Sequence, residues 1–179
     1  QESCKIYEGF FGKQWQTFER DGVCFIILNS CLFGSASEAE DLQWKWFEKT
    51  LSLNSDKRFF IFSHYPPFIT ERNEENNYDN IEQEPRARLL DCIEKYQVEA
   101  IFSGHVHTFF LNEISSTLSY ALPSSTNFRQ DYAEIFRVNP AQEFGRNDVG
   151  KFGFFVVDIY EDGHISIFAR TNGSTELID

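Results

Sequence analysis

The stretch Ile101-Phe102-Ser103-Gly104-His105-Val106-His107 decides how the rest of the chain is interpreted. It joins a short apolar run to two histidines at positions i and i+2, just after a Ser-Gly break. Side chains at i and i+2 of an extended segment point to the same face, and neutral imidazole is a common ligand of catalytic cations. The pattern indicates a metal site, although a His-x-His pair alone is more often two ordinary surface or core histidines.

His64 follows another apolar run and shifts the interpretation toward a metal site. The run Phe59-Phe60-Ile61-Phe62 leads into Ser63-His64-Tyr65-Pro66-Pro67, and the prolines stop a strand there. Three imidazoles from separate elements are harder to explain as incidental than one pair. We therefore predict that His64, His105 and His107 converge on a metal; imidazole suits Zn, Mn, Fe or Ni. His164, the fourth histidine, flanks a turn and is left out of the site.

The remaining apolar pattern predicts an α/β fold. We expect buried strands at 23–28, 59–62 and 98–102, a helix at 37–51 with Ser37 as N-cap, and a helix from Pro85 to about Tyr96. The apolar stripe of the first helix is Leu42, Trp46, Phe47 and Leu51. An antiparallel pair at 109–114 and 118–122 and a hairpin formed by 152–160 and 164–170 follow. This order favours parallel central strands with antiparallel additions and a ligand site beyond the carboxyl ends of the strands.

Three segments carry less regular patterns. Residues 1–21 are expected to form a loop with at most one short strand. The segment 71–82 contains five acidic residues, and we interpret it as a solvated loop in preference to a lid over a site. Residues 123–151 form a long irregular connection whose Arg129, Arg137 and Arg146 either reach a phosphate or balance nearby acids.

Composition bounds the class of protein. The 179 residues are expected to form a single domain, and the 20 phenylalanines imply buried surface on both sides of a sheet. A net charge of -12 disfavours nucleic-acid binding through a basic face. The apolar runs are too short to span a membrane, so no membrane partner is expected. Cys24, Cys31 and Cys92 lie in or beside apolar segments and are expected to be buried, reduced thiols, which favours the cytoplasm while leaving the compartment open.

The residues also carry a resemblance. The segment from Phe62 to Phe68, the segment from Phe102 to His107 and the preceding helix around Gln43 to Leu51 resemble the calcineurin-like metallophosphoesterase family over about residues 22–170. The combination of Gly-His-x-His with an upstream His-x-Pro carries the resemblance, because each motif alone is weak. It implies a sandwich of two mixed sheets with flanking helices and antiparallel carboxyl-terminal strands.

The resemblance also implies a chemistry. His64 and His105 would be ligands of one metal ion and His107 a ligand of its neighbour. Two divalent ions, Mn, Fe or Zn, would flank a bridging hydroxide that attacks the phosphorus of a phosphate mono- or diester. The substrate would be a phosphorylated small molecule or a phosphoprotein.

The sequence departs from the family pattern before His64. The family motifs Asp-x-His, Gly-Asp-x-x-Asp and Gly-Asn-His-Asp/Glu are not found there, and the one Asp-x-His, at 162–164, lies in the late hairpin. These motifs carry the remaining ligands and the histidine that protonates the leaving group. Since the chain also contains no methionine, we expect residues 1–179 to be the carboxyl-terminal part of a longer metallophosphoesterase domain.

The missing motifs limit what the chain does alone. Three neutral imidazoles do not offset the charge of two divalent cations, so we expect at most one weakly bound metal and no catalysis in isolation. A sheet left uncovered by missing strands would favour self-association. Two alternatives stay open: a mononuclear zinc hydrolase or lyase with three histidine ligands, and an inert interaction domain with a degenerate site.

Overall fold

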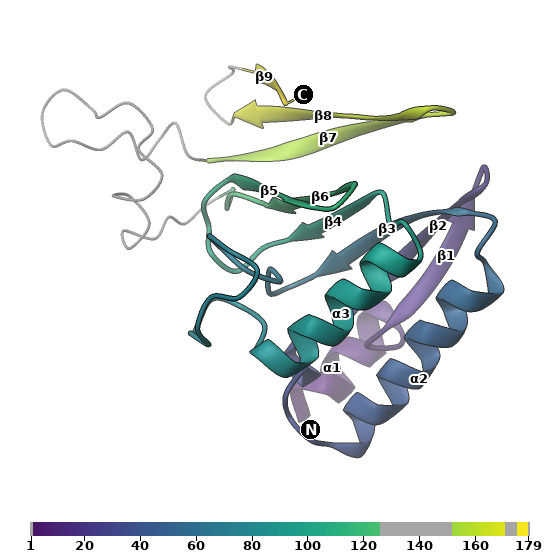
Figure 1. Cartoon of the computed structure of the whole chain (residues 1–179). Coiled ribbons are helices and arrows are strands. Elements are labelled where there is room, and N and C mark those ends of the chain that lie inside the picture. The colour runs from purple at the N-terminus through teal and green to yellow at the C-terminus, as the bar shows by residue number, and fades with distance from the viewer. Residues whose placement is uncertain (1, 126–151, 171–174, 179) are drawn as a thin grey trace, which may run out of the picture. The chain divides into compact units, whose positions relative to one another are not determined.

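The computed structural model describes residues 2–125, 152–170 and 175–178 (Figure 1). Backbone contacts divide the chain into two compact units, which are described separately. The first comprises residues up to 103 together with 112–119, and the second comprises 104–111 and the residues from 120 onward. Arg129, Arg137 and Arg146 of the predicted connection lie outside the described residues.

The larger sheet is mixed, as the α/β prediction requires. Its six strands run in the order β1-β2-β3-β4-β6-β5. Their bounds are β1 Gln16–Arg20, β2 Val23–Ile27, β3 Arg58–Ser63, β4 Ala100–Ser103, β5 Phe110–Ile114 and β6 Thr117–Ala121. The strands β2, β3 and β4 are parallel, and β1 is antiparallel to β2. The three predicted central strands are therefore confirmed, each to within two residues.

Two helices cover one face of this sheet (Figure 1). They are α2 (Glu38–Leu53) and α3 (Gln83–Lys95). Ile26, Ile61 and Ile101 of the strands share a single buried cluster with residues of both helices. The side chain of Ser37 accepts a hydrogen bond from the Glu40 amide and confirms the predicted N-cap.

The apolar stripe predicted for α2 was wrong at one position. Leu42 is 51% exposed, whereas Trp44 is buried in the core. The aromatic ring of Trp44 stacks on Phe33, with centroids 4.6 Å apart, and the guanidinium of Arg88 lies 4.6 Å from the Trp44 ring centroid. Contacts of the Trp44 indole with Phe33 and Arg88 therefore place Trp44, and not Leu42, on the buried face of the helix.

The opposite face of the first unit carries phenylalanines. Phe18, Phe25 and Phe60 pair directly across β1, β2 and β3. Their neighbouring ring centroids lie 4.7 and 5.8 Å apart. Phe62 and Phe102 continue this stacking on β3 and β4. Phe60 and Phe102 are buried, whereas Phe18 is 51% exposed, so the predicted buried surface on both sides of the sheet is seen for part of this row.

The second unit contains a separate antiparallel sheet, β7-β8-β9. Its strands are β7 Gly153–Tyr160, β8 Gly163–Arg170 and β9 Thr175–Ile178. The register from Gly153↔Arg170 to Tyr160↔Gly163 confirms the predicted hairpin, while β9 was not predicted. The hydroxyl of Tyr120 and Nε2 of His164 share a hydrogen bond of 3.1 Å, so His164 does more than flank the turn.

The amino-terminal segment was predicted as a loop, and this was wrong for its first half. Residues Glu2–Phe11 form helix α1, and β1 begins at Gln16. The helix leaves Ile6, Phe10 and Phe11 more than half exposed. The helix spans only ten residues, fewer than α2 and α3, which makes its pattern harder to recognise.

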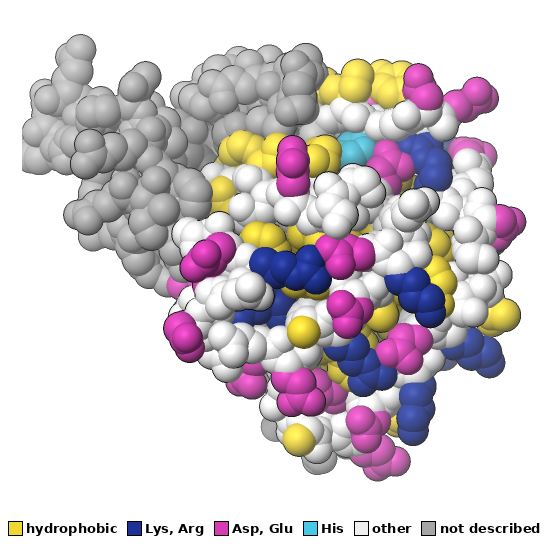
Figure 2. All heavy atoms as spheres, in the orientation of Figure 1, with side chains coloured by type: hydrophobic (Ala, Val, Ile, Leu, Met, Phe, Trp, Pro, Cys, Tyr) yellow, Lys and Arg dark blue, Asp and Glu magenta, His cyan; other side chains and the backbone are white. Residues whose placement is uncertain are grey.

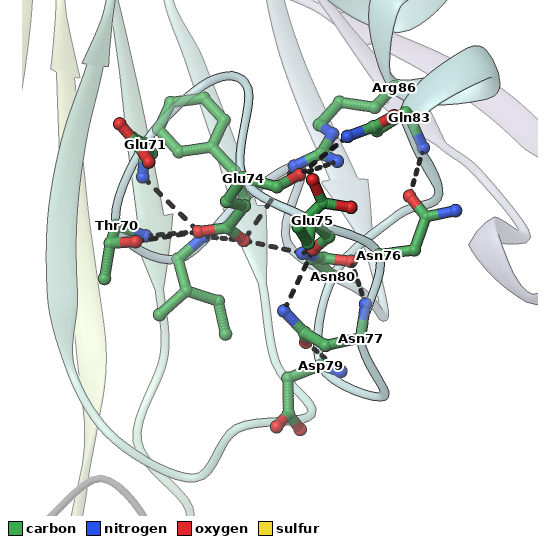
Figure 3. Close-up of polar contacts among 12 residues, drawn as sticks. Thr70, Glu71, Glu74, Glu75, Asn76, Asn77, Asp79, Asn80, Gln83 and Arg86 are labelled. Atoms are coloured by element: carbon green, nitrogen blue, oxygen red, sulfur yellow. Dashed lines mark hydrogen bonds and ion pairs between the residues drawn. The ribbon is translucent and has the colours of Figure 1, made fainter.

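The acidic segment was predicted as a solvated loop, and this was wrong for its central residue (Figure 3). The carboxylate of Glu74 accepts hydrogen bonds from the amides of Ile69 and Thr70, the hydroxyl of Thr70 and the amide of Asn80. Burial raises the pKa of this carboxyl, but the hydrogen bonds outweigh burial and hold the pKa below its ordinary value. The Glu74 side chain therefore holds the loop together through hydrogen bonds to its neighbours.

Arg86 anchors the same loop to helix α3. Its side chain is almost fully buried, and its Nη2 donates to the carbonyl oxygen of Glu74 at 2.7 Å. Its Nη1 lies 3.9 Å from the Glu74 carboxylate. Asp79 and Asn80 are also buried. The segment is thus a packed structural loop, although Glu71, Glu75 and Glu82 stay on its surface.

The charged side chains on the visible face are interspersed (Figure 2). Lysine and arginine side chains alternate with aspartate and glutamate over helices α2 and α3. Pairs such as Arg88–Glu48 and Arg72–Glu94 link them. None of the described helices combines the length and the apolar character that crossing a membrane requires.

Candidate metal site

His64 lies directly after the last residue of β3, where the sequence placed it. The side chain is exposed, and its ring meets the Tyr65 ring edge-on at a centroid distance of 5.1 Å. Pro66 and Pro67, both buried, follow in the turn that ends the strand. The imidazole is therefore accessible at the carboxyl end of a parallel strand, where ligand sites of such sheets form.

The His64 turn is held by two serine hydroxyls. The hydroxyl oxygen of Ser30 accepts hydrogen bonds from the backbone amides of His64 (3.0 Å) and Tyr65 (2.9 Å). The hydroxyl of Ser63 donates to the carbonyl oxygen of Tyr65 at 2.8 Å. These bonds fix the backbone on both sides of the Cα atom of His64.

His105 is the central residue of a tight turn after β4. The amide of Val106 donates to the carbonyl oxygen of Gly104 at 2.8 Å, and His105 has a φ of 68°. This combination fits a γ-turn with a positive central φ, which is rare and strained. Since non-glycine residues in such regions cost about 1–3 kcal/mol and cluster at functional sites, the turn is a candidate functional element.

His107 repeats this strain and adds a second signal. Its φ is 56°, and its Nδ1 atom is buried without a hydrogen-bond partner. A buried polar atom left unpaired costs about 1–3 kcal/mol, so most proteins avoid it. Among the described residues outside the histidine turn, four other non-glycine residues also have positive φ: Asp21, Ala36, Gln97 and Ser115. Nδ1 of His107 shares its lack of a hydrogen-bond partner with Nη1 of Arg86 and Oγ of Ser166 among the described residues, so the combination with a positive φ distinguishes His107.

The two histidine segments begin at neighbouring strand ends. β3 and β4 are parallel and adjacent, and their last residues, Ser63 and Ser103, are paired. His64 follows the first and Gly104 the second. The structure groups His105 with His107 in one turn of the second unit, whereas His64 belongs to the first unit. Convergence of all three rings remains a prediction.

The three histidines supply imidazole nitrogens as their only candidate metal-binding atoms. Imidazole nitrogen is a good ligand for zinc and its neighbours, and the unpaired Nδ1 of His107 is available for such a bond. A pair of divalent ions would also need carboxylates to balance its charge. Across the described residues, no group of three or more His, Cys, Asp and Glu side chains is arranged to hold a metal ion.

The sequence did not identify the residues that support the His64 turn. Ser30 and Gln43 are buried polar side chains, at 3% and 0% exposure. Their signals were a serine just beyond a buried strand and a glutamine within an amphipathic helix, both of which are ordinary by themselves. Only the folded chain shows that the Gln43 side chain binds the backbone of Asn29, the residue before Ser30.

The cysteine prediction was correct at two of three positions. Cys24 and Cys92 are buried and free, and burial raises the pKa of the Cys92 thiol to about 11. Cys31 is free but exposed, because it lies in the short 3-10 helix Ser30–Leu32 and not in β2. The prediction that Cys31 is buried was therefore wrong.

Comparisons with known proteins identify phosphatases as relatives over part of the chain. No protein-family model matches the chain. The chain is 28% identical over 113 residues to the serine/threonine-protein phosphatase CPPED1 of Mus musculus, covering 60% of this chain and 35% of that protein. CPPED1 of Danio rerio is 29% identical over 103 residues, covering 54% and 33%. The chain thus spans about a third of the length of the curated relatives that it matches.

Solved structures support the fold. The chain superimposes on GAP50 from the inner membrane complex of Plasmodium with a TM-score of 0.61, covering 92% of this chain and 53% of that one at 14% identity. Purple acid phosphatase PPD1 from yellow lupin (Lupinus luteus) seeds gives a TM-score of 0.59, covering 93% and 32% at 16% identity. The mixed α/β architecture of this chain is therefore one that at least one phosphatase also uses.

Proposed function

We propose, from the premise that this chain is of the metallophosphoesterase type in sequence and fold, that it contributes to a metal-dependent phosphoesterase. The reaction would be hydrolysis of a phosphate mono- or diester, with His64, His105 and His107 as metal ligands. One observation carries the proposal: an imidazole nitrogen of His107 is buried without a partner, in a strained turn that follows β4. Structural histidines are normally hydrogen-bonded when buried.

Each histidine has a defined part in this proposal. His105 and His107 would present their nitrogens from the turn after β4, and His64 would present its ring from the end of β3. A bound divalent ion would polarise phosphoryl oxygens and lower the pKa of a water molecule. The protein's own contribution would be to present the three imidazoles to the ion, which would limit reorganisation when a ligand binds.

The donor set argues for one ion per chain. Three imidazoles supply no negative charge, whereas two divalent ions carry four positive charges between them. A two-metal centre of Mn, Fe or Zn would therefore require carboxylates from the missing family motifs, supplied by a longer protein. We expect the 179-residue chain to bind at most one ion and to show no turnover alone.

The substrate class follows from the same comparison. The curated relatives bear the name serine/threonine-protein phosphatase, so a phosphoprotein is one proposed substrate and a phosphorylated small molecule is the other. A net charge of -12 disfavours nucleic acid as the phosphate source.

Metal-dependent phosphate binding tests this function. We expect inorganic phosphate to bind the chain only after one equivalent of Zn or Mn is added, as measured by calorimetry. His105→Ala should abolish both metal and phosphate binding, whereas His164→Ala should leave both unchanged. Metal binding that is insensitive to His105→Ala would contradict the proposal. An aryl phosphate assay should show no turnover; robust turnover lost in His105→Ala would refute the one-ion argument.

A mononuclear zinc hydrolase or lyase is the second candidate, since its three-histidine set is already complete in this sequence. It predicts a single tight zinc and, with a suitable ester, activity of the chain alone. Metal stoichiometry and affinity separate the two readings: a dissociation constant below about 1 nM for zinc would favour the mononuclear centre.

A further inference from the structure

We infer that Ser30 is a positioning residue for His64, and that Gln43 holds Ser30 in place. The inference rests on the proposed function, because it assigns these two residues to the geometry of one proposed metal ligand. Neither residue was identified from the sequence, and neither carries a donor atom that faces the metal in the proposal. Their contribution is to fix the backbone from which the imidazole of His64 extends.

The first step is the contact between Ser30 and the His64 turn. One hydroxyl oxygen accepts two consecutive amides, those of His64 and Tyr65, at 3.0 and 2.9 Å. The contact joins residues 34 and 35 positions apart, so it is set by tertiary structure. With two adjacent amides fixed, His64 retains only its side-chain torsions, and the Tyr65 ring 5.1 Å away restricts these further.

The second step is the attachment of Ser30 itself. Ser30 begins a 3-10 helix whose N-cap is Asn29, and the Asn29 side chain accepts from the Cys31 amide. Just before it, the Leu28 amide donates to the carbonyl oxygen of Phe62, so the connection leaves β2 directly beside β3. The serine hydroxyl is thereby presented to the backbone that follows β3.

Helix α2 holds Asn29, the residue before Ser30, through the side chain of Gln43. The Gln43 side chain accepts from the Asn29 amide at 2.8 Å and donates to the Asn29 carbonyl oxygen at 3.1 Å. Gln43 is fully buried, and both ends of its amide are therefore used by one backbone residue. A buried amide with both partners satisfied is a rigid attachment, because losing either bond leaves an unpaired polar group.

These contacts form a continuous route from helix α2 to a proposed ligand. When a residue that orients a metal ligand through hydrogen bonds is removed, metal affinity typically falls by about 10–100-fold. A purely structural role would instead lower stability without a specific effect on metal binding. The two roles are therefore separable by experiment.

The test compares four variants of the whole 179-residue chain. Ser30→Ala removes the hydroxyl, Ser30→Thr retains it, Gln43→Glu keeps the acceptor for the Asn29 amide but removes the donor, and Ser119→Ala is a control at another buried serine. Without metal, Ser30→Ala should accelerate hydrogen exchange at the amides of residues 64 and 65, and Ser30→Thr should not. Unchanged protection in Ser30→Ala would overturn the inference.

Metal affinity gives the second readout. Zinc titration should show affinity about tenfold or more weaker in Ser30→Ala, a smaller loss in Gln43→Glu, and wild-type affinity in Ser30→Thr and Ser119→Ala. If Ser30→Thr does not fold, Gln43→Glu keeps the inference testable, because it leaves Ser30 itself intact. Equal zinc affinity in wild type and both remaining variants would overturn the inference while leaving the proposed function intact.

A double-mutant cycle distinguishes positioning from general loosening. In a His64→Ala background, Ser30→Ala should cause no further loss of zinc affinity, because the ligand that it positions is gone. An undiminished second loss would show that Ser30 acts through the whole fold and would overturn the inference. If the wild-type chain binds no zinc at all, the proposed function fails first and this inference fails with it.

Discussion

Two polar turns of this chain differ in how their central titratable side chain is bonded. In the loop around Glu74, five hydrogen bonds converge on one carboxylate, while Nη1 of the neighbouring Arg86 has no hydrogen-bond partner and lies 3.9 Å from that carboxylate. The turn containing His105 and His107 has positive φ at both histidines and leaves the Nδ1 of His107 unpaired. In the first region polar residues stabilise the fold, and in the second they retain bonding capacity. The difference teaches that a carboxylate saturated with hydrogen bonds acts within the fold, whereas an unpaired ring nitrogen keeps the capacity to bind a ligand.

The largest expected effect is in the loop. Glu74→Ala should lower the free energy of unfolding by about 3 kcal/mol, because the Ile69 amide and the Asn80 side chain lose their acceptor and the buried Arg86 loses its nearest carboxylate. Urea denaturation measures this. Glu75→Ala, which removes an exposed acid from the same loop, should change it by less than about 0.5 kcal/mol. Equal effects in both variants would show that the loop is merely solvated.

The protonation of Glu74 should also be visible. Because the pKa of this carboxyl is lowered on folding, its stabilisation is complete above the ordinary value of 4.5 and is lost as pH falls through the lower folded pKa. The difference in unfolding free energy between wild type and Glu74→Gln should therefore be constant above about pH 5.5 and shrink below pH 4.5. A difference that grows on acidification would contradict the net effect assigned to the hydrogen bonds.

A pair of glycines tests how closely the acidic segment packs. Gly34 and Gly22 have φ of 82° and 78°, so alanine is strained at both by about 1 kcal/mol. A Cβ atom at Gly34 would also lie 2.7 Å from the Glu82 carboxylate, while nothing lies within 4 Å at Gly22. Thermal denaturation should show Gly34→Ala as the slightly less stable variant, because the exposed Glu82 side chain can move aside, and adding Glu82→Ala should remove the small excess. Identical melting temperatures for the two alanine variants would contradict this close approach.

The smallest expected effect is a gain in stability when position 107 carries glycine and not alanine. His107→Gly should be more stable than His107→Ala by about 1 kcal/mol, because glycine adopts a positive φ without strain. Gln97, whose φ is 50°, provides the matched control outside the histidine turn. Both His107 variants should lose metal affinity, whereas Gln97→Gly should keep it. A metal affinity retained in His107→Gly would remove His107 from the ligand set.

The sequence anticipated the parts of the fold that depend on local pattern. Continuous apolar runs identified β2, β3 and β4, and Ser37 correctly marked the start of α2. Helix α1, which spans only ten residues, was missed. The exposure of Cys31 and the burial of Glu74 were missed because both depend on contacts with distant segments.

The candidate site was anticipated as a set of residues but not as a supported geometry. Histidines following two apolar strands are visible in the sequence, and the structure confirms that both strands end there. The positive φ of His105 belongs to a local turn that no residue type marks, and the Ser30–Gln43 attachment is invisible in sequence because it arises from the packing of elements far apart along the chain. Chemistry-bearing residue types were therefore predictable, and the contacts that hold them were not.

A Co(II) titration followed by visible absorption tests the central claim most directly. We predict one equivalent of Co(II) per chain, nitrogen-ligand absorption bands, and loss of those bands in each of His64→Ala, His105→Ala and His107→Ala but not in His164→Ala. A spectrum that survives His64→Ala while His105→Ala abolishes it would show that the end of β3 takes no part in the site, and would contradict the account.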